Sequence, residues 1–192
     1  IRGDRLYALG LVYLTTGARK GEVAALKWEV VDLDGGEMRI VRSRSTVGYR
    51  VYETRGKREC SRRRIELDAL TVAALKSWRA RQLEERLAAG PAWEETGYVF
   101  TNRQGQPMHP DSIYRMLRRR VERAGLPWIG IKGMRHTWAT LALASGEQIK
   151  VVAERLGHSS IKTTGDVYQH CLPGMQREAA ERVADLIFRP NA

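Results

Sequence analysis

Residues 131–140 read IKGMRHTWAT, and residues 156–168 read LGHSSIKTTGDVY. Arg135, His158 and Tyr168 occur in these stretches beside signals for the start or end of a helix. Polar groups gathered at the ends of elements are more typical of a functional site than of a core. A tyrosine close to several cations suits a group that attacks an anion. The pattern therefore predicts attack on a phosphodiester.

Charge is the main feature of the composition. The chain has 192 residues with 43% hydrophobic side chains, which is enough for one globular domain with a core. It holds 33 Lys and Arg against 22 Asp and Glu, a formal net charge of +11. A domain this basic usually meets a polyanion. An evenly spread solubility charge is the alternative, but the arginines cluster at 62–64 and 118–120.

Several classes of protein are disfavoured. The two cysteines, Cys60 and Cys171, fit a reducing compartment and no disulfide framework. The cysteines and histidines lack zinc spacing, and there is no phosphate-binding loop, membrane-crossing run or signal peptide. We therefore expect a cytoplasmic protein with no metal or other cofactor.

Hydrophobic periodicity predicts an α+β fold that is mostly α-helical. A short helix is expected after Gly17, and the longer helices are expected at residues 5–16, 68–89, 112–124, 134–144, 147–156, 163–170 and 176–188. Alternating segments at 37–41, 50–53 and 62–67 predict one small antiparallel sheet. Lys57 is expected at the tip of its hairpin.

Two basic surfaces are predicted to contact DNA phosphates. The first is the β-ribbon, with Arg55, Arg58, Arg62, Arg63 and Arg64. The second is the outer face of the helix at 112–124, with Arg115, Arg118, Arg119 and Arg123. Both suit a duplex backbone. The alternative for each is a solvated surface.

The residue types fit cleavage of a phosphodiester. Tyr168 is the candidate nucleophile, and because a free phenol has a pKa of ~10, nearby cations or a base must favour its phenolate. The guanidinium groups of Arg19 and Arg135 bind two phosphate oxygens each. His158 can donate a further hydrogen bond, and Lys57 can protonate the leaving oxygen. These cations supply the charge that a metal would otherwise bring.

Four stretches together resemble the catalytic domain of the tyrosine recombinases, the phage integrase family. They are residues 16–23, which contain Arg19, residues 56–67, residues 132–135 and residues 156–168. The resemblance implies the catalytic fold of that family, a helical domain with a small antiparallel sheet or hairpin. It also implies the catalytic set Arg19, Lys57, Lys132, Arg135, His158 and Tyr168.

One position departs from the family pattern. Histidine most often stands three residues before the second arginine, and here Lys132 stands there. Lysine can contact phosphate, but its free pKa of ~10.4 makes it a poorer base than histidine unless it is desolvated. Whether Lys132 is a base or only a phosphate ligand stays open. We interpret His136 as a structural histidine, and Trp128 and Trp138 as core residues.

The resemblance further implies site-specific recombination of double-stranded DNA through a 3′-phosphotyrosine, giving integration or excision. It implies tetramers on two duplexes, with the helix at 176–188 docking on a neighbour, and a role for accessory DNA-bending proteins. Residues 1–192 would be the catalytic domain, a C-terminal fragment without the N-terminal core-binding domain. No nucleotide cofactor would be needed, because the phosphotyrosine conserves the energy of the broken bond.

Two rival functions remain. A type IB topoisomerase uses similar tyrosine chemistry but rejoins the same strand, and the tight spacing of residues 156–168 argues against it. A catalytically silent DNA-binding module would keep the basic surfaces with an idle tyrosine. The full set from Arg19 to Tyr168 disfavours that reading.

Overall fold

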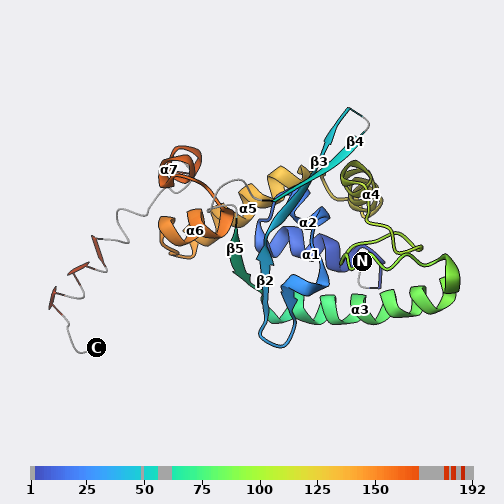
Figure 1. Cartoon of the computed structure of the whole chain (residues 1–192). Coiled ribbons are helices and arrows are strands. Elements are labelled where there is room, and N and C mark those ends of the chain that lie inside the picture. Colours follow the sequence, from blue (N-terminus) through green and yellow to red (C-terminus); the bar gives the residue numbers. More distant parts are fainter. Residues whose placement is uncertain are drawn as a thin grey trace.

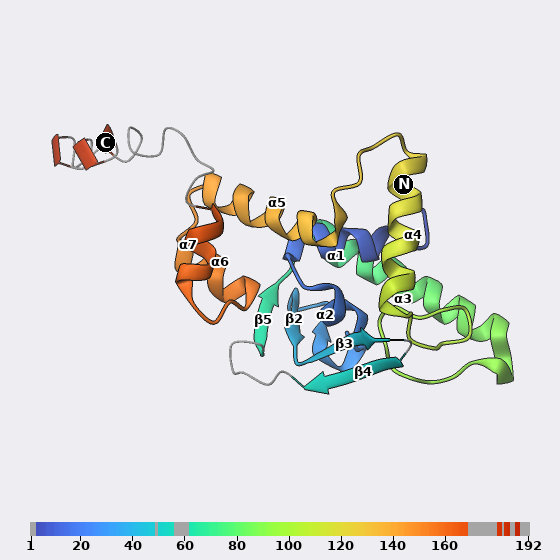
Figure 2. The ribbon, with the colours of Figure 1, turned by 90° about the horizontal axis from the view of Figure 1, so that it is seen from above.

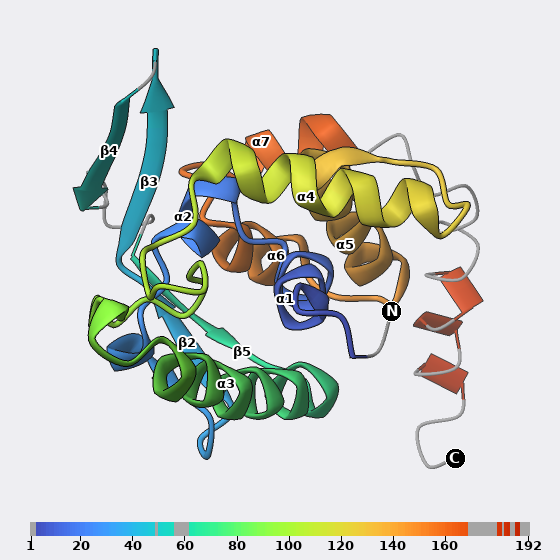
Figure 3. The same ribbon diagram turned by 90° about the vertical axis from the view of Figure 1, so that its right-hand side faces the viewer.

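Helix α1 (Tyr7–Thr16) lies at the centre of the computed structural model, with other elements on all sides (Figures 1 and 3). The structure describes residues 3–48, 50–55 and 62–168, with residues 180, 181, 183, 184, 187 and 188 near the C-terminus. The buried side chains of α1 are Ala8, Leu9, Val12, Tyr13 and Thr16. These positions share one side of the helix, so α1 is most deeply covered on that side, whereas Leu14 is 45% exposed.

The other helices lie beside α1 or beyond its end (Figures 1 and 2). They are α2 (Lys20–Ala24), α3 (Ala69–Ala89), α4 (Pro110–Arg123), α5 (Gly130–Ala144), α6 (Ile149–Leu156) and α7 (Ile161–Tyr168), with short 3-10 turns at Trp28–Val30 and Gly90–Ala92. Seen from above, α6 and α7 pack together near the far end of α5 (Figure 2). The prediction of a mostly helical α+β chain is confirmed. The predicted helix at 176–188 lies largely outside the described residues.

Helix α3 shows how local signals set a boundary. Asp68 precedes it, and its Oδ1 accepts a hydrogen bond of 3.0 Å from the backbone N–H of Thr71. Its Oδ2 accepts one of 2.6 Å from the Thr71 hydroxyl. Such a cap satisfies a donor that the first turn leaves unpaired. The predicted span of 68–89 is confirmed within one residue.

The strands form two sheets instead of the single sheet that was predicted. Strands β1 (Val31–Asp32), β2 (Glu37–Ile40) and β5 (Arg63–Glu66) form one antiparallel sheet, with Met38 opposite Ile65. Strands β3 (Arg42–Val47) and β4 (Arg50–Arg55) form a separate hairpin. Since β4 and β5 belong to different sheets, the predicted hairpin between them is wrong. Lys57 itself lies outside the described residues.

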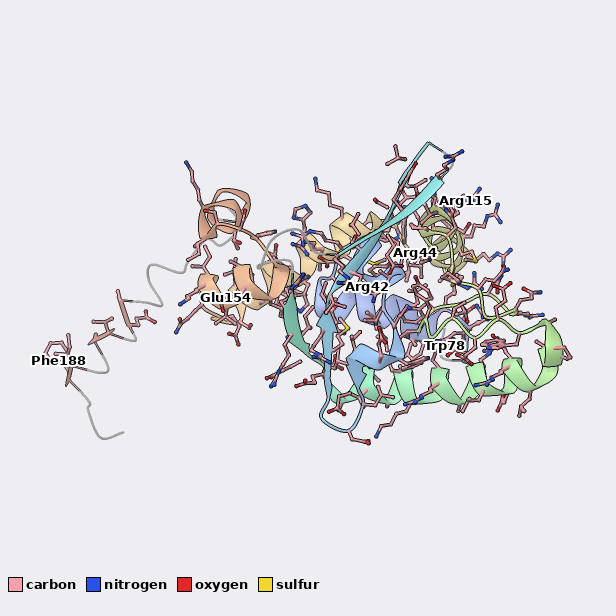
Figure 4. All side chains as sticks on the ribbon, viewed as in Figure 1. Arg42, Arg44, Trp78, Arg115, Glu154 and Phe188 are labelled. Atoms are coloured by element: carbon pink, nitrogen blue, oxygen red, sulfur yellow. The ribbon has the colours of Figure 1, made fainter. Side chains whose placement is uncertain are left out.

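The β3–β4 hairpin projects from the body next to α4 (Figures 1 and 3). Its base is held by Arg44, whose Nη1 donates to the backbone oxygen of Met108 at 3.0 Å (Figure 4). Glu53 on β4 accepts a hydrogen bond from the hydroxyl of Tyr98. Gly21 of α2 lies so close to β3 that an added Cβ would be 2.5 Å from the backbone oxygen of Arg44. The hairpin is therefore anchored at one end and open at the other.

Candidate active site

Two glycines end the helices that meet at the site. Gly17 follows α1 with a φ of 63°, and Gly157 follows α6 with a φ of 67°. This left-handed conformation is strained for residues with a Cβ. At Gly17 an added Cβ would also lie 2.9 Å from Cδ2 of Leu156 and 3.2 Å from Cε3 of Trp138. Glycine therefore allows the ends of α1 and α6 to approach each other.

Arg135 of α5 joins these two helix ends. Its Nη1 donates to the backbone oxygen of Gly17 at 2.7 Å, and its Nη2 donates to that of Leu156 at 2.7 Å. The last carbonyl groups of a helix lack intrahelical partners and carry partial negative charge, so a guanidinium satisfies them well. The residue is buried, with 9% of its surface exposed. Its orientation is therefore fixed by the backbone of two helices.

Arg19, between α1 and α2, has two anchors of its own. Its Nη2 donates to the backbone oxygen of Gly157 at 2.8 Å, and its Nη1 donates to Oε1 of Glu22 at 2.8 Å. The side chain is nevertheless 42% exposed. Arg19 is thus oriented on one side and open to a ligand on the other.

Glu22 is a buried carboxylate shared by two arginines. Only 5% of its side chain is exposed, and it pairs with both Arg19 and Arg63. Burial alone would raise its pKa, but hydrogen bonds and charge from Arg63, and then from Arg19, lower the pKa to about 2. Arg19 and Glu22 are three residues apart, a spacing that by itself favours an ion pair on the surface of a helix. The pair forms, but it is part of a buried cluster.

His158 follows directly after Gly157. Its Nδ1 lies 2.8 Å from the hydroxyl of Thr164, a buried residue of α7. Partial burial, followed by the charges of Arg135 and Arg19, lowers the pKa of His158 to about 4. The imidazole is therefore neutral near pH 7. When Thr164 donates to Nδ1, the Nε2–H remains available as a donor.

These side chains surround a pocket of about 690 Å³. Its polar lining consists of Arg19, Lys20, Tyr114, Lys132, Arg135, His136 and His158. Four of the six predicted catalytic residues, from segments far apart in the chain, therefore meet in one place. With two guanidinium groups, two lysines and two imidazoles, the pocket suits an anion with several oxygens.

The other two predicted catalytic residues, Tyr168 and Lys57, lie partly or wholly outside the described part of the structure. Tyr168 is the last residue of α7, one helical turn after Thr164, and its side chain lies outside the described part of the structure. Lys57 and Arg58 fall in the undescribed segment 56–61. Their predicted roles stay predictions.

The model of the phage integrase family matches residues 3–174, nearly the whole chain. The chain belongs to the phage integrase family. The resemblance inferred from four sequence stretches is thereby confirmed.

Curated relatives of this integrase-family chain include tyrosine recombinases and integrases. A XerC-like tyrosine recombinase of Caldanaerobacter subterraneus is 34% identical over 200 residues, which cover 98% of this chain and 51% of that protein. The ICEBs1 integrase of Bacillus subtilis is 30% identical over 176 residues, covering 92% and 48%. The chain thus spans about half the length of these relatives.

Solved structures of the family share the fold. The crystal structure of XerA recombinase matches with a TM-score of 0.69 and 26% identity, covering 100% of this chain and 59% of that one. A structure of the Tn1549 transposon integrase in complex with transposon right end DNA matches with a TM-score of 0.76 and 26% identity, covering 96% and 61%.

Most of the predicted DNA-binding arginines of this integrase-family chain lie on its surface. Arg115, labelled in Figure 4, is exposed on α4, as are Arg118 and Arg119. Arg55, Arg62 and Arg64 are exposed on or beside the strands. Arg63 departs from the prediction. Only 7% of its side chain is exposed, and it binds Glu22 instead of facing solvent. Its position in β5 places alternate residues on opposite faces of the sheet, so Arg63 and Arg64 have different surroundings.

Three polar pocket residues, Lys20, Tyr114 and His136, were not among the predicted site residues. His136, interpreted as structural, lines the pocket, where partial burial and the charges of Lys132 and Arg135 lower its pKa. Tyr114 of α4 also lines it, and its hydroxyl accepts a hydrogen bond of 3.0 Å from Trp128. His136 follows Lys132 by four residues on a helix, a spacing that places both on one face and could have revealed it.

The part of the chain that the structure describes contains no group of three or more His, Cys, Asp or Glu side chains able to hold a metal ion. None of its helices combines the length and apolar character needed to cross a membrane.

Proposed function

We propose that this chain is the catalytic domain of a site-specific DNA recombinase that cuts and rejoins strands through a covalent phosphotyrosine. The observation that carries the proposal is the pocket in which Arg19 and Arg135 are held by helix-end carbonyl groups. Arg135 donates to two backbone oxygens, which hold its guanidinium at the pocket. Family membership and the solved complex of the Tn1549 integrase with DNA support double-stranded DNA as the ligand.

Each proposed role follows from the chemistry of the side chain. The phenolic oxygen of Tyr168 attacks the phosphorus, forming a P–O bond, and its proton passes to a neutral imidazole of the pocket or to solvent. The bond to the 5′-oxygen breaks, and that oxygen takes a proton from Lys57. Arg19, Arg135, Lys132 and the N–H of His158 stabilise the non-bridging oxygens during the attack. A 5′-hydroxyl of a partner strand then reverses the chemistry and releases the tyrosine.

Covalent trapping tests the nucleophile. Nicked suicide duplexes with a randomised core are incubated with the protein, and the captured sequences are amplified to give a defined substrate. We expect wild type to form a protease-sensitive covalent band with this duplex. Tyr168→Phe should form none, since the phenolic oxygen is the attacking atom.

Two other tyrosines provide matched controls. Tyr114→Phe changes a tyrosine that lines the pocket, and Tyr52→Phe changes an exposed tyrosine of β4. Both variants should keep the band. A band that persists in Tyr168→Phe and disappears in Tyr114→Phe would move the nucleophile to α4 and contradict the assignment.

A second assay separates recombination from topoisomerase chemistry. Both reactions form the same covalent intermediate and give the same band, but only a recombinase joins strands from two different duplexes. Using the captured sequence on two labelled duplexes, we expect exchanged products. Relaxation of a supercoiled plasmid without exchange would instead favour a type IB topoisomerase, and DNA binding without any band would favour a silent module.

We also propose that the working form is a homotetramer on two duplexes, in the nucleoid, with the segment at 176–188 docking on a neighbour. Exposed apolar side chains support this docking. Within that segment Val183, Ile187 and Phe188 are more than half exposed, and Leu141 and Ile161 are exposed on α5 and α7. The mass of the complex on the captured duplex tests the stoichiometry, and accessory DNA-bending proteins can be added to the same assay.

A further inference from the structure

Arg63 lies outside the lining of the pocket, and it contacts Glu22, one anchor of Arg19, and the end of α6 near the other anchor. Its Nη1 and Nη2 donate to Oε1 and Oε2 of Glu22 at 3.0 and 2.8 Å. Its Nε donates to the backbone oxygen of Arg155 at 2.6 Å. Arg155 comes two residues before Gly157, whose backbone oxygen is the other anchor of Arg19. One side chain thus connects the carboxylate and the helix end that orient Arg19.

We propose that Arg63 is a positioning residue for strand cleavage: it holds Glu22 and the end of α6 so that the guanidinium of Arg19 faces the phosphate. The inference rests on the proposed function. Arg63 does not line the pocket, so it acts through Glu22 and Arg19 and not on the DNA.

The charges explain why Arg63 is needed. Glu22 is buried, and a single carboxylate paired only with Arg19 would draw that guanidinium toward itself and cancel its charge. With Arg63 present, two positive groups share one negative group, leaving a net charge of about +1 for the cluster. The guanidinium of Arg63 donates to both oxygens of the Glu22 carboxylate. Arg19 therefore needs to donate only its Nη1 to that carboxylate.

The chain offers a matched control for an effect on stability alone. Arg5 also binds both oxygens of a mostly buried carboxylate, Glu85, at 2.8 and 2.7 Å, and also donates to a backbone oxygen, that of Thr101. Arg5 and Glu85 do not line the pocket. Arg5→Gln should therefore destabilise the fold much as Arg63→Gln does, without disturbing Arg19.

The test measures single-turnover cleavage of the captured duplex at saturating protein, and DNA affinity separately. We expect Arg63→Gln to slow cleavage by roughly 100-fold, as small misplacements of catalytic groups do, with little change in Kd. Arg63→Lys keeps the charge but not the three bonds, so it should recover part of the rate. Arg5→Gln should cleave at the wild-type rate.

A neutral substrate distinguishes positioning from general damage. A methylphosphonate at the cleaved position lacks one negative charge, so it depends less on Arg19. The losses caused by Arg63→Gln and by Arg19→Gln should therefore both shrink on this substrate. A loss of the same size on both substrates would indicate a merely structural role and overturn the inference, as would a wild-type rate in folded Arg63→Gln.

Two further readouts keep the inference testable. If Arg63→Gln does not fold, the decision passes to Arg63→Lys, whose loss must also shrink on the methylphosphonate. Inorganic phosphate, titrated while the His158 resonances are followed by NMR, tests Arg19 without any cleavage. We expect weaker phosphate binding in Arg63→Lys than in Arg5→Gln, and equal binding would overturn the inference. Absence of a covalent band in wild type would instead count against the proposed function.

Discussion

The imidazole of His158 should report the charge state of the pocket. Partial burial and the neighbouring guanidinium groups of Arg135 and Arg19 lower its pKa to about 4. A bound phosphodiester adds a negative charge beside those cations, so the pKa of His158 should rise toward the ordinary value on binding DNA. NMR titration of the imidazole, without and with the captured duplex, measures this shift. Arg19→Gln should raise the pKa without DNA.

The lowered pKa of His158 also makes the stability of the fold depend on pH. The folded pKa of His158 lies below its unfolded value of about 6.5. Protonation therefore favours the unfolded chain, and the stabilisation is complete above pH 6.5 and is lost as the pH falls toward 4. A His158 pKa that stays constant when DNA binds would contradict a phosphate site beside the two arginines.

At the residue scale, short-range sequence signals predicted the residues of the pocket. The pairing between residues far apart in the chain could not be predicted in this way. Arg19, Arg135 and His158 were found because each lies near a glycine or a helix boundary, which a sequence shows directly. The pairing of Glu22 with Arg63 joins residues 41 positions apart, and nothing in the local pattern marks either side chain as buried. Arg63 was therefore grouped with the exposed arginines on both sides of it.

At the element scale, Gly21 sets the distance between α2 and the β3–β4 hairpin. An added Cβ would meet the backbone oxygen of Arg44 and the hydroxyl of Ser43, each at 2.5 Å. Gly21→Ala should therefore push β3 away and destabilise the fold by about 1–3 kcal/mol. Chemical denaturation measures the change.

Gly10 gives the opposite expectation for the same substitution. It lies within α1, and an added Cβ would be 3.9 Å from its nearest neighbour, Cδ2 of Leu117. Gly10→Ala should stabilise the fold by roughly 0.5–1 kcal/mol, because alanine loses less backbone entropy in a helix. Stabilisation by both substitutions would mean that α2 and β3 do not pack as closely as described.

Elements with an apolar side were predictable, and the polar hairpin was not. Strand β3 has the sequence RSRSTV, in which no apolar residue alternates with the polar ones until the last position. A strand that gives no face to the core lacks the period-two signal. The pairing of β2 with β5 across a long insertion is likewise a tertiary choice that sequence separation conceals. Helix α5 starts at Gly130 and not at residue 134 as predicted. The prediction was late because Gly130 and Gly133 resemble a loop in the sequence.

At the scale of the whole molecule, the positive charge should bind DNA from one side. In Figure 3, α4 and α3 lie on opposite sides of α1. Replacing Arg115, Arg118 and Arg119 of α4 with Gln should weaken DNA binding and reduce the slope of log Kd against log salt by up to ~0.9 for each lost phosphate contact. Replacing Lys76, Arg79 and Arg86 of α3 with Gln is the matched control and should leave the slope unchanged. Equal slopes for both triple variants would show that α4 does not contact the backbone.

The central position of α1 determines when, during synthesis, the pocket can form. Residues 7–16 are synthesised long before residues 130–144, yet α5 covers α1 and the pocket needs Gly17 and Arg135 together. Contacts between such distant segments form slowly, because a long loop must close first. On the ribosome, Leu9, Val12 and Tyr13 therefore stay partly uncovered until α5 has been synthesised. A chain synthesised only as far as residue 129 therefore lacks Arg135 and has no complete pocket.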